Sequence, residues 1–240
     1  NSITLNSLFS AVWSYILSCY CQTDDVLFGI ALSGRNAKVA GIDNIVGLLI
    51  NTVPLRIKIN KACVIDEFIA QVQDNVLQVA EFSSYTPLSK IQRWSDFTAN
   101  EDMFQTLLVF ENYNKLSASA DNAIKFKRLN LWAPTHYPLT INISTADSIK
   151  ITTYYNSKCF NKSFIKNLHT HMSNVVKQVV ANKYQFLSEL EILTWQEKNL
   201  LQRKWVGKSQ GLTSQTIDQI FEQSVVQHAD RLAVVHKSDI

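Results

Sequence analysis

The sequence contains little of what usually marks a secreted or membrane-spanning protein. Its 240 residues include only four cysteines. Their irregular spacing fits neither a disulfide framework nor paired zinc knuckles. The longest apolar runs, such as residues 45–50, are far shorter than the roughly 18 to 20 residues that a membrane-spanning helix needs. The first residues also do not read as a basic segment followed by an apolar one. We therefore expect a cytoplasmic protein with no membrane partner.

Charge of one sign is also scarce. Lysine and arginine number 23 against 20 aspartates and glutamates, and the formal net charge is +3. Like charges form no long block, so nucleic acid is not the favoured partner. The apolar fraction is 46% and the charged fraction only 18%. That balance predicts a packed globular core.

Residues that could carry out chemistry do not gather in a recognisable pattern. His169 and His171 lie two apart on a predicted helix, on different faces, whereas a helical metal pair needs a spacing of three or four. Cys19 and Cys21 stand without a second cysteine pair. The sequence has no nucleophile elbow, phosphate loop or dinucleotide fingerprint. We expect no metal site and no self-contained active site.

Hydrophobic periodicity predicts a compact α/β unit over the first 182 residues. The apolar residues recur at helical spacing in residues 3–20 and 63–82, in a shorter piece near 88–94, and in a long helix that Asn161 caps. Strand-like segments are residues 26–33, 53–59, 104–110, 124–129, 139–145 and 149–155. The last two read as a hairpin, and Pro54 indicates a strand start or an edge strand.

The pattern of apolar and polar residues changes after Tyr184. We expect an extended stretch over residues 186–193, a charged helix over 194–205 and a loop over 207–214. A helix then opens at Ser214 or Thr216, and a strand begins at residues 232–235. The predicted organisation is one domain over residues 1–185, a linker over 186–213 and the start of another domain over 214–240.

Two side chains near the second predicted strand have competing interpretations. Arg35 follows Ser33 and Gly34 in a loop, where its guanidinium can bind an anion or pair with backbone carbonyls. The structural role is the commoner one. Asn51 ends an apolar segment, where an amide usually closes a turn.

Several motifs together resemble the C-terminal half of condensation domains of nonribosomal peptide synthetases. Residues 28–36 read FGIALSGRN, and residues 46–56 read VGLLINTVPLR, which fits a core motif of that family. Further similar segments are YTPL at 85–88, FQTLLVFENY at 104–113 and THYPLT at 135–140. Residues 216–223 and 229–235 look like the first residues of an adenylation domain.

The resemblance implies an α/β fold: a chloramphenicol acetyltransferase-like lobe, of the CoA-dependent acyltransferase type, with a mixed sheet packed against helices. It implies amide-bond formation between a donor acyl or peptidyl thioester and an acceptor aminoacyl thioester, both held on carrier proteins. The family's catalytic His-His-x-x-x-Asp-Gly motif lies in the first lobe and does not occur in this chain. We therefore expect the chain to begin inside a longer domain and to be inactive alone.

By the same resemblance, this lobe supplies one wall of the substrate tunnel. The residues expected there are Ser33, Gly34, Arg35, Gly47, Asn51 and Thr52, with Asn36 beside them. No cofactor is expected to bind directly, because phosphopantetheine arms arrive on the carrier proteins. The expected partners are the first lobe, peptidyl carrier proteins and the adjoining adenylation domain.

Two alternatives stay open. An epimerisation domain belongs to the same superfamily, although the Ser-Gly-Arg sequence and the following adenylation start argue against it. A non-catalytic docking or truncated lobe is the other.

Overall fold

The computed structural model describes residues 2–35, 39–83, 85–97, 101–111, 135–145, 148–182, 184–204 and 215–232. The chain divides into two compact units, Asn1–Thr194 and Trp195–Ile240. The first unit contains the α/β fold, and each unit is described by itself below.

The first unit is built on a five-stranded sheet of order β2-β1-β3-β4-β5. Its strands are β1 (Asp25–Leu32), β2 (Asn51–Lys58), β3 (Thr106–Glu111), β4 (Leu139–Ser144) and β5 (Lys150–Tyr155). The three central strands run parallel, whereas β2 and β5 are antiparallel to their neighbours. The mixed sheet and the β4–β5 pairing are as predicted, and Pro54 lies on an outer strand, where a missing N–H is tolerated. The strand predicted at residues 124–129 lies outside the described residues.

Four helices accompany the sheet: α1 (Leu5–Cys21), α2 (Ile65–Ser83), α3 (Leu88–Trp94) and α4 (Lys162–Ala181). Side-chain caps define two of their starts. Thr4 Oγ1 accepts a hydrogen bond from the backbone N–H of Ser7 at 3.1 Å, and Asn161 Oδ1 accepts one from Phe164 at 2.7 Å. The predicted cap at Asn161 is therefore confirmed.

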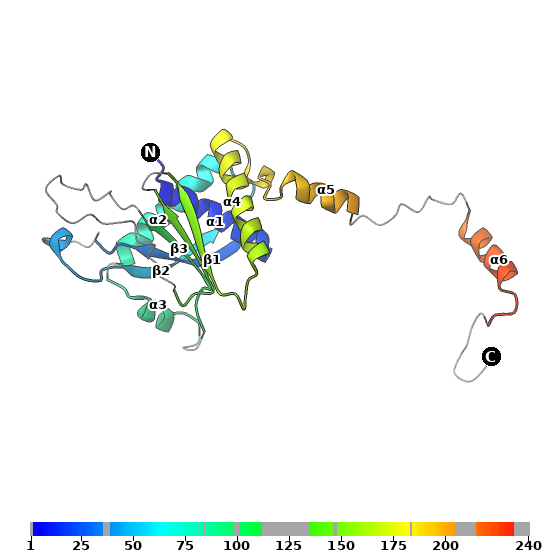
Figure 1. The fold of residues 1–240 in the computed structure, drawn as a ribbon, viewed down its shortest axis with the longest axis horizontal. Helices are drawn as coiled ribbons and strands as arrows, with labels where there is room; N and C mark the ends of the chain where they lie inside the picture. The colour runs from blue at the N-terminus through cyan, green and yellow to red at the C-terminus, as the bar shows by residue number, and fades with distance from the viewer. Residues whose placement is uncertain are drawn as a thin grey trace, which may run out of the picture. The chain divides into compact units, whose positions relative to one another are not determined.

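Helices α1, α2 and α4 share one apolar core with one face of the sheet (Figure 1). Alternate strand residues such as Phe28, Leu55 and Ile141 point into this core and are fully buried. The opposite face carries a smaller apolar cluster of Phe104, Leu107 and Tyr137. Among the described residues, the helix-covered face thus supplies most of the burial.

Gly29 explains how the second face is packed. A Cβ atom at this position would lie 2.2 Å from the Phe104 ring, so only glycine lets the ring approach the strand. Phe104 in turn stacks on Tyr137 with ring centroids 5.0 Å apart. The absence of one side chain therefore positions two aromatic rings.

The segment after α4 differs from the extended linker that we expected from residue 186. It contains a short 3₁₀ helix (η2, Leu187–Glu189), and Phe186 bridges to Val64. The backbone N–H of Phe186 donates to the Glu189 carboxylate at 3.2 Å, which favours this turn over an extended strand. The first compact unit accordingly continues to Thr194.

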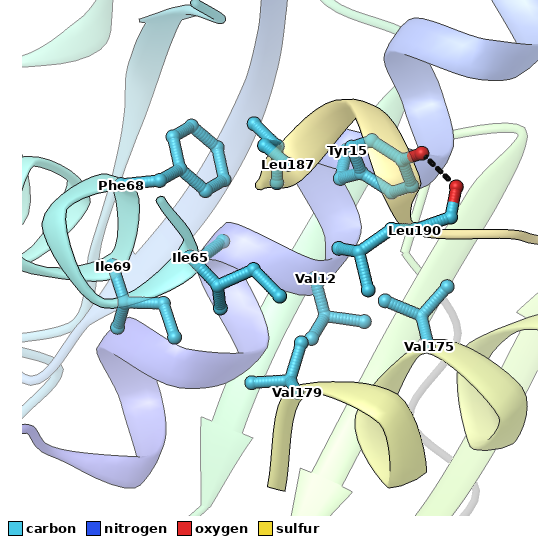
Figure 2. Close-up of a pocket in the computed structure, with 10 residues that line it drawn as sticks. Val12, Tyr15, Ile65, Phe68, Ile69, Val175, Val179, Leu187 and Leu190 are labelled. Carbon is cyan, nitrogen blue, oxygen red and sulfur yellow. Dashed lines mark hydrogen bonds between the residues drawn. The ribbon is translucent and has the colours of Figure 1, made fainter. Parts of the chain in front are cut away.

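Leu187 and Leu190 hold this segment on the lobe. Figure 2 shows both side chains directed at residues of α1, α2 and α4, with the Tyr15 hydroxyl donating to the Leu190 carbonyl. The remaining space among these side chains is only about 10 Å³, too small for a ligand. This apolar junction is therefore part of the core and not a binding site.

The second unit contains α5 (Trp195–Lys204) and α6 (Ile217–Gln227). The backbone N–H of Thr216 donates to Gln219 Oε1 at 3.1 Å, which supports Thr216 as the start of the last helix. The predicted loop at residues 207–214 and nearly all of the predicted strand at 232–235 lie outside the described residues. Within the described part of the chain, no helix is long and apolar enough to cross a bilayer.

Candidate functional site

The predicted site residues gather along one edge of the sheet. Because β1, β3 and β4 are parallel, their carboxyl ends meet at the same edge, where antiparallel β2 and β5 begin. Ser33 and Gly34 follow β1, and Asn51 and Thr52 open β2. Asn51 pairs with Leu32, and Thr52 pairs with Ala31. Carboxyl edges of parallel strands are common ligand positions in α/β proteins, which makes this edge the candidate site.

Gly34 allows the loop after β1 to pass close to the segment before β2. Its φ of +68° is in the left-handed region that disfavours side chains. A Cβ atom here would lie 1.9 Å from the Leu49 carbonyl oxygen. Both the backbone angle and the close approach therefore require glycine.

Arg35 takes the structural role that its sequence position favoured. Its Nη1 donates to the Ile42 carbonyl at 2.7 Å, and its Nη2 donates to the Ile45 carbonyl at 3.4 Å. These carbonyls belong to the first residue of the short 3₁₀ helix η1 (Ile42–Asn44) and to the residue that follows it. Arg35 is exposed, so its guanidinium stays at the surface while it organises this turn. Asn36 lies outside the described residues.

Asn51 links the sheet edge to a helix end. Its Nδ2 donates to the carbonyl of Ser83, the last residue of α2, at 2.9 Å. The bond satisfies one of the carbonyls that a helix terminus leaves without a partner. Gly47 lies apart from these contacts, because a Cβ atom there would meet nothing within 4 Å. Of the two predicted glycines, Gly34 is closely packed and Gly47 has open space around it.

The segment between Ile45 and β2 exposes apolar side chains. Val46 is 98% exposed, Leu48 is 88% exposed and Ile50 is 59% exposed. We call these three residues the apolar ridge. Large neighbouring apolar side chains left in water commonly mark an interaction surface.

The same sheet edge holds two polar residues that the sequence analysis did not assign to the site: Asn142, inside the strand predicted at 139–145, and Glu111, just past the strand predicted at 104–110. Glu111 ends β3, and Asn142 lies in β4, two residues before the Glu111 partner Ser144. Asn142 Nδ2 donates to Glu111 Oε1 at 2.8 Å. Asn142 Oδ1 is buried and has no partner among the described residues. The signal in the sequence was the alternation of β4, in which Asn142 shares the polar face with Thr140 and Ser144.

The histidines are dispersed, as predicted. Thr153 Oγ1 lies 2.7 Å from His169 Nε2, and burial lowers the pKa of His169. Buried His171 shares a 2.7 Å hydrogen bond with the Tyr20 hydroxyl, and the His136 ring lies tilted against Tyr137 with ring centroids 4.0 Å apart. In the described ranges, no group of three or more metal-ligating side chains is found.

A separate open cavity of about 660 Å³ lies near the opposite edge of the sheet. It is lined by residues at the starts of β1, β3 and β4 together with apolar side chains of α1 and α4. None of the predicted site residues lines it. The two features are therefore distinct places in the lobe.

Sequence comparison relates the chain to large peptide synthases. It is 30% identical to bacitracin synthase 3 of Bacillus licheniformis and to gramicidin S synthase 2 of Brevibacillus brevis, each over 245 aligned residues and 100% of this chain. It is 28% identical over 97% of its length to surfactin synthase subunit 3 of Bacillus subtilis. The chain covers only 4%, 5% and 18% of these three relatives, respectively.

Solved structures show the same fold. A structure named CT superposes with a TM-score of 0.71 at 18% identity, over 80% of this chain and 44% of that one. The starter condensation domain of the rhizomide synthetase RzmA superposes with a TM-score of 0.65 at 15% identity, over 79% of this chain and 45% of the other. The lobe therefore has the CoA-dependent acyltransferase fold that the motifs implied.

The Condensation domain family matches residues 1–202. The chain thus belongs to the condensation domain family of nonribosomal peptide synthetases.

Proposed function

We propose that this chain forms the second lobe of a condensation domain that joins two carrier-bound thioesters through an amide bond. The donor is an acyl or peptidyl thioester, and the acceptor is an aminoacyl thioester. The observation that carries this proposal is the family match over residues 1–202. The motif His-His-x-x-x-Asp-Gly is absent from the sequence, so the catalytic histidine would come from the first lobe.

The sheet edge suits a wall that positions substrates. Gly34 and Asn51 fix the loops after β1 and before β2, and the apolar ridge projects beside them. Holding an amine close to a thioester carbonyl removes much of the entropic barrier of a bimolecular reaction. We propose that Ser33, Gly34, Arg35, Gly47, Asn51 and Thr52 serve this positioning role on the tunnel wall.

The partners follow from the same proposal. Carrier proteins would deliver the substrates on phosphopantetheine arms, and the first lobe would cover the apolar ridge. Residues 214–240 would begin an adenylation domain, connected through the linker that precedes it. The alignment of bacitracin synthase 3 along the whole chain supports a continuation past the condensation domain. A cytoplasmic location stays a prediction.

Amide formation between two carrier-loaded aminoacyl thioesters, followed by intact-mass spectrometry, tests the proposal. The chain alone is compared with the chain plus a separately expressed first lobe. We expect product only from the mixture. Product from the chain alone would contradict a missing catalytic group, and no product in either case would favour a non-catalytic docking lobe.

Two variants then test the tunnel wall in the active mixture. Asn51→Ala removes the bond to Ser83, and Arg35→Ala removes the bonds to Ile42 and Ile45. We expect each to lower product formation about tenfold, because misplaced reacting groups lose the positioning advantage. Asn174→Ala is the control, since Asn174 makes comparable amide-to-carbonyl bonds on α4. Activity equal to that of the control would remove these residues from the wall.

A further inference from the structure

The Glu111–Asn142 pair presents hydrogen-bond acceptors that no cation among the described residues matches. A carboxylate only accepts hydrogen bonds, so the 2.8 Å contact with Glu111 Oε1 identifies the nearer atom of Asn142 as its amide nitrogen. Asn142 Oδ1 is then the remaining polar atom, and it is buried without a partner. A buried acceptor in this state costs about 1–3 kcal/mol, which a ligand donor would recover.

Glu111 carries a charge that no described side chain neutralises. Among the described residues, the printed ion pairs join Arg56 to Asp25 and Lys61 to Asp24, and none involves Glu111. Lys150 lies opposite Ser144 in the β4–β5 register, and Ser144 lies opposite Glu111 in the β3–β4 register. Among the ion pairs of the described residues, however, none joins Lys150 to Glu111. Glu111 is half-buried, so its carboxylate is less screened than one on the open surface. A half-buried carboxylate beside a free amide oxygen favours a cationic donor.

The position of the pair suits the substrate path. Strand register places Val109, Glu111 and Asn142 on the face opposite α1, α2 and α4. This face meets the same carboxyl edge at which Ser33 and Gly34 follow β1. A group held by Glu111 and Asn142 would therefore lie along the edge that bears the predicted tunnel residues.

We propose that Glu111 and Asn142 bind the α-amino group of the acceptor aminoacyl substrate as an ammonium, before it passes one proton to the catalytic histidine of the first lobe and attacks the donor thioester. An ammonium offers three N–H donors and one positive charge. One donor can satisfy the Glu111 carboxylate and another the Asn142 Oδ1, while Asn142 Nδ2 keeps the carboxylate oriented. This inference rests on the proposed function, because it assigns the acceptor side of that reaction to one end of the sheet edge.

Binding of alaninamide to the chain alone tests this assignment without any reaction. Its α-amino group is mostly protonated at pH 7. The side-chain amide signals of Asn142 are followed by two-dimensional ¹H–¹⁵N NMR, with N-acetylalaninamide as the uncharged match. We expect saturable shifts with alaninamide only. Equal shifts with both compounds, or none with either, would overturn the proposal.

Variants of Glu111 test whether its carboxylate binds the ammonium group of alaninamide. Glu111→Gln should abolish the Asn142 response or weaken the affinity about tenfold, because a charge-assisted bond becomes a neutral one. Glu81→Gln makes the same change at an exposed position on α2 and should leave the response unchanged. Should Glu111→Gln fail to fold by circular dichroism, Glu111→Asp keeps the charge at a shorter reach and should bind more weakly. An unchanged affinity in the folded Glu111 variant would contradict the assignment.

The condensation reaction gives a second readout. With the first lobe present, Glu111→Gln should raise the acceptor KM more than it lowers kcat, because the contact is made to the bound amine. The NMR arm needs neither the first lobe nor turnover, so its failure removes this assignment and leaves amide formation standing. Conversely, if alaninamide binds but no amide product forms, the proposed reaction is contradicted and the assignment of Glu111 and Asn142 is not.

Discussion

At the residue scale, Gly34 shows how a missing side chain shapes the candidate site. Gly34→Ala must either move the Leu49 carbonyl or abandon the φ of +68°. Such strain costs about 1–3 kcal/mol, so we expect the free energy of unfolding in urea to fall by that amount. Gly47→Ala is the matched control, because a Cβ atom there meets no neighbour. Equal stability of the two variants would mean that the loop shifts without cost.

His169 should make stability depend on pH through its lowered pKa. Burial disfavours the imidazolium in the folded state, whereas the unfolded chain protonates near the ordinary value of 6.5. The unfolded state therefore binds more protons as the pH falls below about 7, and the free energy of unfolding decreases by at most about 1.4 kcal/mol per pH unit. The stabilisation is present above pH 7 and is lost toward pH 5.

His169→Gln tests this pH dependence, because glutamine can still bond to Thr153 but does not titrate. Urea unfolding at pH 7, 6 and 5 should show a shallower loss of stability in the variant than in the parent chain. The comparison between the two profiles removes the contribution of every other titrating group. Parallel profiles would show that His169 protonates equally well in both states.

At the element scale, the main helices and most of the described strands could be predicted because they bury one face. The regular spacing of Phe9, Val12 and Ile16 is visible in the sequence alone. The 3₁₀ helix at Leu187–Glu189 could not be predicted, because it depends on contacts with Val64 and Tyr15 that lie far away along the chain. Strand order was equally hidden, since β1 pairs with β2 and β3 on opposite sides.

The candidate site was predictable only in part, for the same reason. Gly34 and Asn51 stand in recognisable motifs, and their interpretation as loop and turn residues agrees with their contacts. Glu111 and Asn142 are separated by thirty residues, and only the β3–β4 register brings them within 2.8 Å. Periodicity places Asn142 in a predicted strand and Glu111 just beyond another, but it does not reveal which strands become neighbours.

Truncation tests where the lobe ends. Ending the chain after Lys204 should leave the melting temperature unchanged, because the first compact unit stops at Thr194. Ending it after Gln185 removes Leu187 and Leu190, which are 1% and 6% exposed, and leaves the Tyr15 hydroxyl without its acceptor. Each lost leucine costs about 2–5 kcal/mol, enough together to unfold a lobe of ordinary stability.

A point variant separates packing from chain length in this test. Leu190→Ala in the full chain should lower the free energy of unfolding by about 2–5 kcal/mol while the backbone acceptor for Tyr15 stays in place. Leu201→Ala on α5, whose side chain is partly exposed, serves as the control and should change stability little. A stable chain ending at Gln185 would contradict the assignment of residues 186–194 to the lobe.

At the scale of the whole molecule, the chain resembles part of a larger assembly. It covers 44% of the CT structure, while 80% of its own length superposes on that structure. The apolar ridge is then the feature that the proposed first lobe would cover. Val46 and Leu48 contribute almost nothing to the core of this lobe, because they are 98% and 88% exposed, whereas Ile50 is 59% exposed.

Replacing the apolar ridge therefore separates folding from assembly. Val46→Ser with Leu48→Ser should leave the melting temperature unchanged, because both side chains are more than four-fifths exposed at 98% and 88%. If the first lobe buries them, each loss removes about 1.5–3 kcal/mol of apolar stabilisation, so association should weaken at least about tenfold. Isothermal titration calorimetry with the first lobe measures this change. Leu77→Ser with Val180→Ser, at exposed positions on α2 and α4, should leave the affinity unchanged. An equal loss in both double variants would place the interface elsewhere, since a general decrease in surface hydrophobicity would then account for it.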